Sequence, residues 1–145
     1  MRFSLAILAS FGFLACTGPT AGPSAGHGPK VTYHKAEGAI GPYSSAVQVG
    51  GLVMLSGKIG TRGEGFEHEV TTCIDRIEGD LGTLGLELSD VVEARVYLTD
   101  MNRYADFNAI YGARFTEPYP ARTCVAVAAL PAGAQVEIQV AARAR

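Results

Sequence analysis

The pattern that most constrains the fold is an alternating apolar run followed by an amphipathic segment and then by a second apolar run. Within residues 90–100, DVVEARVYLTD, apolar and polar side chains alternate with a period of two, which predicts a β-strand. Residues 101–117 repeat apolar side chains at helical spacing, and Asp100 is placed to cap that helix. Residues 121–130 return to a strand pattern. This order predicts helices packed against a sheet.

The remaining segments extend the predicted order to β-β-α-β-α-β-β. The Gly50-Gly51 pair indicates a turn between two strands, and Gly85 suits the end of the first helix. We expect an edge strand at 31–35, strands at 46–49 and 52–57, a helix at 69–85 and a last strand at 135–143. The predicted fold class is α+β, a mixed sheet with both helices on one face.

The second face of such a sheet needs a cover. We expect Val125 on that face, and with it Val136, Ile138 and Val140 of the last strand. Because 48% of the residues are hydrophobic and only 18% are charged, burial of this face in an oligomer is the favoured solution. A net charge of -2 gives no attraction to phosphate backbones, so we expect no nucleic-acid partner.

Cysteine and histidine usage predicts no metal site. The three cysteines and three histidines form neither a C-x-x-C nor an H-x-x-x-H spacing. Cys73 falls in the first predicted helix and Cys124 in a predicted strand. A disulfide between them stays open at this point, because sequence alone cannot place it.

The N-terminus has the pattern of an export signal. Arg2 is followed by an uncharged run over residues 3–15, which is shorter than the roughly 20 residues that span a bilayer. The ending FLAC resembles a bacterial lipobox, so Cys16 is the expected lipidation site, with plain cleavage after Ala15 or a different start codon as alternatives. Residues 17–30 are a Gly/Pro-rich tether, and 31–145 form the domain. We therefore expect an exported protein facing the periplasm, which touches the membrane only through its lipid anchor.

The first candidate site lies at the start of the strand over residues 121–130. Arg122 and Cys124 share a face of that strand, with small alanines beyond them. A guanidinium beside a shallow apolar floor suits a small carboxylate, because its planar fork matches both oxygens. An ordinary surface ion pair for Arg122 remains the alternative.

Three other places could contribute to the same site. A hairpin through residues 131–134 would bring Glu137 level with residues 126–128, where it could hold a water, although the pattern alone favours an outward, solvated glutamate. Tyr43 follows a Gly-Pro turn. Ser56 and Gly57 end a strand and could offer backbone N–H groups to an anion.

Four motifs together resemble the reactive intermediate deaminase (Rid, or YjgF-type) family, and its RidA branch in particular. They are AIGPYSSAV, LSGKIG, VVEARVYLTDMNRYADFNAIYGARF and YPARTCVAVAALPAGAQVEIQVAA, in order across residues 31–145. The resemblance implies a chorismate-mutase-like fold and a homotrimer with sites between subunits. It also implies hydrolysis of reactive enamine or imine acids, such as 2-aminoacrylate, to 2-keto acids and ammonia, without a cofactor.

The resemblance also implies roles for individual residues. Arg122 would bind the substrate carboxylate, Glu137 would position water, and Cys124 belongs to the same catalytic motif. The further substrate-binding residues that it implies are Tyr43, Ser56, Gly57 and Asn108.

Two departures from the family pattern leave a second function open. The segment TEPYPAR is shorter than the family pattern, which would reshape the rim of the pocket. The export signal separates the protein from the cytosolic enzymes that make these enamines. The alternative is therefore a non-catalytic envelope module that binds small carboxylates or a protein partner.

Overall fold

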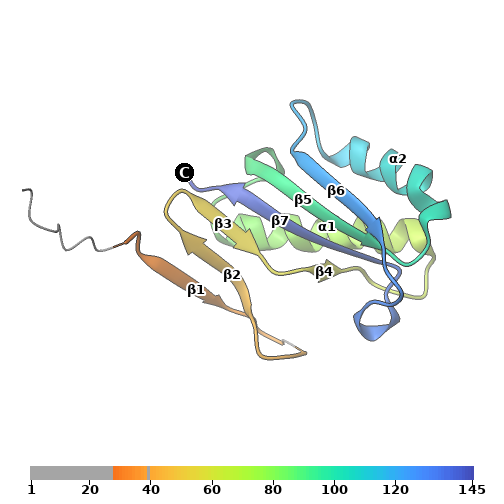
Figure 1. The fold of residues 1–145 in the computed structure, drawn as a ribbon, viewed down its shortest axis with the longest axis horizontal. Helices are drawn as coiled ribbons and strands as arrows, with labels where there is room; N and C mark the ends of the chain where they lie inside the picture. Colours follow the sequence, from red (N-terminus) through yellow and green to blue (C-terminus); the bar gives the residue numbers. More distant parts are fainter. Residues whose placement is uncertain (1–27, 39) are drawn as a thin grey trace, which may run out of the picture.

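The computed structural model describes residues 28–38 and 40–145, which form one mixed sheet with helices against one face (Figure 1). The strands are β1 (Val31–Lys35), β2 (Ser44–Val49), β3 (Leu52–Leu55), β4 (Lys58–Ile59), β5 (Val91–Leu98), β6 (Ala121–Ala126) and β7 (Val136–Arg143). The helices are α1 (Phe66–Thr83) and α2 (Tyr104–Arg114), with short 3₁₀ turns at Leu88–Asp90, Met101–Arg103 and Pro131–Gly133. The fold class and the predicted elements are confirmed, and the structure adds the two-residue strand β4, which was not predicted. The expected lipidation site, Cys16, lies outside the described residues.

Local sequence signals explain where the helices begin and end. The backbone N–H groups of Gly85 and Leu86 donate to the carbonyls of Gly82 and Leu81, and Gly85 has the positive φ of 71° that this helix ending requires. The Asp100 carboxylate accepts from the backbone N–H of Asn102 at 2.9 Å and so caps the 3₁₀ turn Met101–Arg103. The predicted cap thus lies on the turn that leads into α2, and α2 itself begins at Tyr104 without a side-chain cap. No helix within residues 28–38 and 40–145 combines the length and apolarity of a membrane span.

The order of strands in the sheet differs from the simplest reading of the sequence. The order is β1-β2-β3-β7-β5-β6, and β4 pairs with β7 beside that path. All neighbours are antiparallel except β5 and β6, which run parallel and are connected through α2. The expected hairpin between β6 and β7 is therefore wrong: β5 lies between them, so that Tyr97 pairs with Val125 on one side and with Glu137 on the other.

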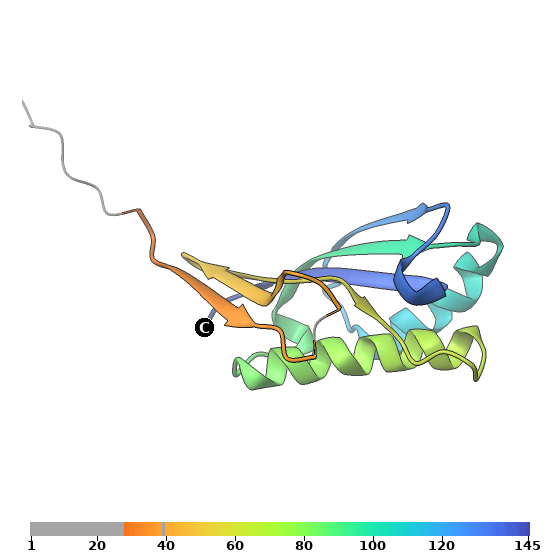
Figure 2. The ribbon, with the colours of Figure 1, turned by 90° about the horizontal axis from the view of Figure 1, so that it is seen from below.

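Figure 2 shows, from below, that the helices lie on one side of the sheet. The buried core residues come from the sheet and from both helices. Val136, Ile138 and Val140 are almost fully buried in this core. Their expected place on the open face is therefore wrong, because the alternation of β7 turns these three toward the helices and turns Glu137, Gln139 and Ala141 away from them.

A buried glutamate fixes the start of β7. Glu69 of α1 is 1% exposed, and its carboxylate accepts from both the backbone N–H and the side-chain amide of Gln135, at 2.7 and 3.0 Å. A buried carboxylate with two donors is satisfied where it stands. This contact holds the chain two residues before Glu137, and so fixes the position at which β7 begins.

Candidate active site

Arg122 lies on the helix side of the edge strand β6, and α2 surrounds its guanidinium. Nη2 donates to Asn108 Oδ1 at 2.7 Å and to the Tyr104 hydroxyl at 3.2 Å. The guanidinium carbon also lies 4.7 Å from the centre of the Tyr111 ring and 5.5 Å from that of Phe107. Such cation–π contacts and hydrogen bonds hold the cation in a single place.

A hollow of about 320 Å³ opens beside this cation. It is lined by Asn108, Tyr111, Gly112, Tyr119, Pro120 and Arg122. Burial raises the pKa of Tyr111 to about 12 although Arg122 opposes the shift, so its phenol stays protonated at neutral pH. None of the described residues that line this hollow is acidic, so the positive charge of Arg122 is available to an anion.

Cys124 points to the same side of the sheet as Arg122, as predicted, and packs against the core. Burial raises the pKa of the Cys124 thiol, and the nearby Arg122 counteracts only part of that shift. The side chain is therefore a neutral thiol at neutral pH. Cys73 is buried, and both cysteines are free, so the disulfide that the sequence left open is not formed.

Glu137 lies in a different hollow, on the opposite side of the sheet. This hollow, of about 250 Å³, is lined by Ile40, Tyr43, Ser56, Gly57, Ile59, Pro131 and Glu137. Partial burial among these largely apolar groups raises the pKa of Glu137. The structure therefore brings Tyr43, Ser56, Gly57 and Glu137 together, as predicted.

Both hydrogen-bond donors of Ser56, its backbone N–H and its hydroxyl, are already used within the sheet. Its N–H donates to the carbonyl of Ser45 at 2.9 Å, and its hydroxyl donates to the carbonyl of Ser44 at 2.6 Å. The expectation that the Ser56 N–H is offered to an anion is therefore wrong. Ser56 instead shapes the hollow by tying its strand end to β2.

Gly57 allows the Glu137 carboxylate to approach the backbone. A Cβ atom at Gly57 would collide with Glu137 Oε1 and would lie 2.8 Å from its Cδ. A methyl group at this position must therefore push the carboxylate out of its place.

We expect Gly57→Ala to lower catalytic turnover about tenfold or more while the protein still folds, because Glu137 is displaced rather than removed. Gly79→Ala is the matched control, since a Cβ at Gly79 meets no atom within 4 Å. The measurement is kcat for both variants, together with their melting temperatures. Unchanged kcat in Gly57→Ala would show that the position of the carboxylate is unimportant.

The two hollows do not form one pocket within a single chain. Paired residues on neighbouring strands point to the same side of the sheet. Arg122 and Cys124 pair with Ala94 and Val96, which point into the core, whereas Glu137 pairs with Tyr97, which points to the opposite side. The expected common floor for Cys124 and Glu137 is therefore wrong. The physical reason is the strand order, because β5 separates the two strands and the alternation of β7 turns Glu137 outward.

Sequence reasoning missed the aromatic surroundings of Arg122. The apolar pattern over residues 101–117 predicts a helix face with Tyr104, Phe107 and either Ile110 or Tyr111, but no contact with Arg122. Residues spaced by three and four along a helix meet the same neighbour. That spacing was the available signal. It could not be used without knowing that β6 packs under α2.

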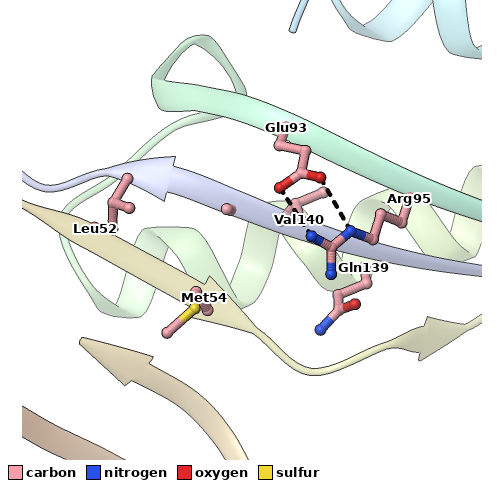
Figure 3. Close-up of a pocket in the computed structure, with 7 residues that line it drawn as sticks. Leu52, Met54, Glu93, Arg95, Gln139 and Val140 are labelled. Carbon is pink, nitrogen blue, oxygen red and sulfur yellow. Dashed lines mark hydrogen bonds and ion pairs between the residues drawn. The ribbon is translucent and has the colours of Figure 1, made fainter. Parts of the chain in front are cut away.

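The open face of the sheet carries a third hollow, shown in Figure 3. Glu93 and Arg95, two residues apart on β5, line it and form an ion pair, with Arg95 Nε 3.0 Å from Glu93 Oε1. Leu52 and Met54 of β3 line it from the other side of β7 and are 44% and 40% exposed. Val125 is also exposed, as predicted for this face. The open face thus combines apolar side chains with paired charges.

The fold and the site together define an α+β protein of the chorismate-mutase-like type, with an arginine beside a hollow on one sheet face and a partly buried glutamate in a hollow on the other. The family model described as Endoribonuclease L-PSP matches residues 33–144. The chain belongs to this family, which confirms the resemblance to YjgF-type proteins.

Its relatives include proteins named for deaminase activity. The chain is 39% identical over 116 residues to "RutC family protein y4sK" of Sinorhizobium fredii, covering 75% of this chain and 92% of that one. It is 34% identical over 121 residues to the 2-iminobutanoate/2-iminopropanoate deaminase of Salmonella typhimurium, covering 77% and 94%. The crystal structure of RidA from a Psychrobacter species matches with 39% identity and a TM-score of 0.71, covering 78% of this chain and 97% of that one.

Proposed function

We propose that this protein is a deaminase that hydrolyses reactive 2-imino acids, and the enamines that tautomerise to them, to 2-keto acids and ammonia. The observation that carries the proposal is the fixed, unneutralised guanidinium of Arg122 beside an open hollow. The deaminase names of relatives such as the Salmonella protein support it.

The chemistry divides between the two hollows. Arg122 pairs with the substrate carboxylate, and Asn108 fixes the guanidinium. Glu137 orients a water that adds to the C=N carbon of the protonated imine. The resulting carbinolamine loses ammonia, which leaves the C=O of the 2-keto acid. Tyr43 and Gly57 form the wall around that water, and the neutral thiol of Cys124 lies two residues along β6 from Arg122, packed against the core.

A complete site then requires two subunits. Arg122 and Glu137 point to opposite sides of the sheet in one chain, so the Arg122 of one subunit must meet the Glu137 of its neighbour. We propose a homotrimer in which the open sheet faces, with exposed Leu52 and Met54, are buried against one another. Light scattering that reports a monomer at assay concentration would contradict this arrangement.

The activity is tested by generating the imine in situ. An amino-acid oxidase converts an amino acid to its 2-imino acid, and semicarbazide traps whatever survives. We expect the full-length chain to lower the yield of trapped product in proportion to its concentration. If a folded trimer leaves the yield unchanged for several amino acids, the catalytic proposal fails and a binding role with the same arginine takes its place.

The location of the protein is a separate proposal that rests on the sequence of residues 1–16. We propose export, with Cys16 carrying the lipid anchor on the periplasmic side. Mass spectrometry of the mature protein should find acyl chains on Cys16, and Cys16→Ser should release the protein from the membrane fraction. A wild-type protein recovered without acyl chains would contradict this proposal.

A further inference from the structure

Three rings lie close to the Arg122 guanidinium, and Tyr104 differs from the other two, Phe107 and Tyr111, in being open to solvent. Phe107 and Tyr111 are 0% and 4% exposed, whereas Tyr104 is 40% exposed. Its hydroxyl is also the one polar aromatic atom among the described residues that bonds directly to Arg122, at 3.2 Å from Nη2. Of these three rings, Tyr104 is therefore the one that can touch both the cation and an incoming ligand.

The direction of this hydrogen bond determines whether the Tyr104 hydroxyl can still donate its own proton to a ligand. Arg122 has donors only, so the phenol oxygen accepts and its own proton points elsewhere. Nη2 carries two N–H groups, and Asn108 and Tyr104 account for both. Among the described residues, the Arg122 donors without a partner are therefore those of Nη1 and Nε. A carboxylate cannot accept hydrogen bonds from Nη1 and Nη2 together, its usual bidentate mode, as long as Asn108 and Tyr104 occupy both N–H groups of Nη2.

We propose that Tyr104 is a second carboxylate ligand and sets the preference of the site for carboxylates. One carboxylate oxygen accepts from Arg122 Nη1, and the other accepts from the Tyr104 hydroxyl. The cation polarises the phenol, which strengthens its proton as a donor. This inference rests on the proposed function, because it assigns a further contact to the same substrate carboxylate.

The test measures binding of an unreactive 2-keto acid, which carries the same carboxylate as the substrate. Pyruvate and 2-oxobutanoate are titrated into the full-length chain by calorimetry. Tyr104→Phe should raise Kd about five- to tenfold, as expected for one hydrogen bond to a charged group. In the deaminase assay KM should rise by a similar factor with little change in kcat. Tyr33→Phe is the matched control, because it removes a more exposed tyrosine hydroxyl on β1 that has no contact with Arg122.

The outcomes separate this inference from the proposed function. If Arg122→Ala loses binding but Tyr104→Phe binds within twofold of wild type, the Tyr104 contact is wrong, whereas carboxylate binding by Arg122 is supported. Tighter binding by Tyr104→Phe would also overturn it, since the hydroxyl would then compete with the ligand. If Arg122→Ala binds as well as wild type, the carboxylate clamp itself fails. A Tyr104→Phe melting temperature within about 2 °C of wild type shows that the loss is not structural.

Discussion

Arg122→Ala should lower kcat/KM for imine hydrolysis by about a thousandfold, because it removes the charge-assisted hydrogen bonds that hold the substrate carboxylate. The same variant should no longer bind 2-keto acids measurably. The measurement is the semicarbazide-trapping assay beside a calorimetric titration.

Arg122→Lys is the informative companion to this variant. It keeps the positive charge but loses the planar fork and the contacts with Asn108 and the aromatic rings. It should therefore recover only part of the activity. Activity in Arg122→Ala close to wild type would show that the substrate is held elsewhere and would contradict the proposed site.

The second large effect is expected for Glu137→Gln, which should lower kcat about a hundredfold while binding of 2-keto acids stays within a few-fold of wild type. The amide keeps the size of the side chain and removes its ability to accept the proton of the attacking water. A kcat that survives this change would mean that water attacks without help from the carboxylate.

The pH dependence of the same step follows from the raised pKa of Glu137. Burial disfavours the carboxylate, so its titration lies above the ordinary value of 4.5. Activity that needs the ionised form is full above this raised pKa and falls as the pH drops through it. The acidic limb of the kcat profile should disappear in Glu137→Gln, after subtraction of the uncatalysed reaction.

These two variants also test the divided site when they are mixed. Homotrimers of Arg122→Ala or of Glu137→Gln lack one partner in every site. Trimers reassembled from both kinds of subunit place an intact Arg122 opposite an intact Glu137 in about a quarter of the sites, if assortment is random. Recovery of activity on mixing supports sites shared between subunits. Absence of recovery after proven subunit exchange contradicts them.

The elements of this fold could be predicted from the sequence because each leaves a local signal. The alternation of apolar and polar side chains that predicts β5, and the Gly85 that predicts the end of α1, can each be recognised within a few residues of sequence. The order of the strands could not be read in this way, because pairing joins segments far apart in the chain. The insertion of β5 between β6 and β7 is such a pairing.

Candidate site residues could be named from the sequence, but their arrangement could not. Arg122 was named from its place on a strand and Glu137 from the family resemblance, yet their separation onto two faces depends on the strand order. Asn108 was named by family resemblance alone, as a substrate-binding residue, because a helical asparagine has no distinctive pattern of its own. Its hydrogen bond to the Arg122 guanidinium was not predicted. The pattern around Gly57 gave no sign that a glutamate 80 residues later requires its missing side chain.

The two halves of the site rest on different parts of the scaffold. Arg122 is supported by α2, whereas Glu137 is set by the Glu69–Gln135 contact and by Gly57. Substitutions on α2 can therefore alter which carboxylic acid binds to Arg122 without displacing Glu137, the group that orients water. Substitutions around β4 can do the reverse. Carboxylate binding and water activation can thus change independently of each other in this fold. Each of the two properties can be altered by substitutions in its own part of the domain.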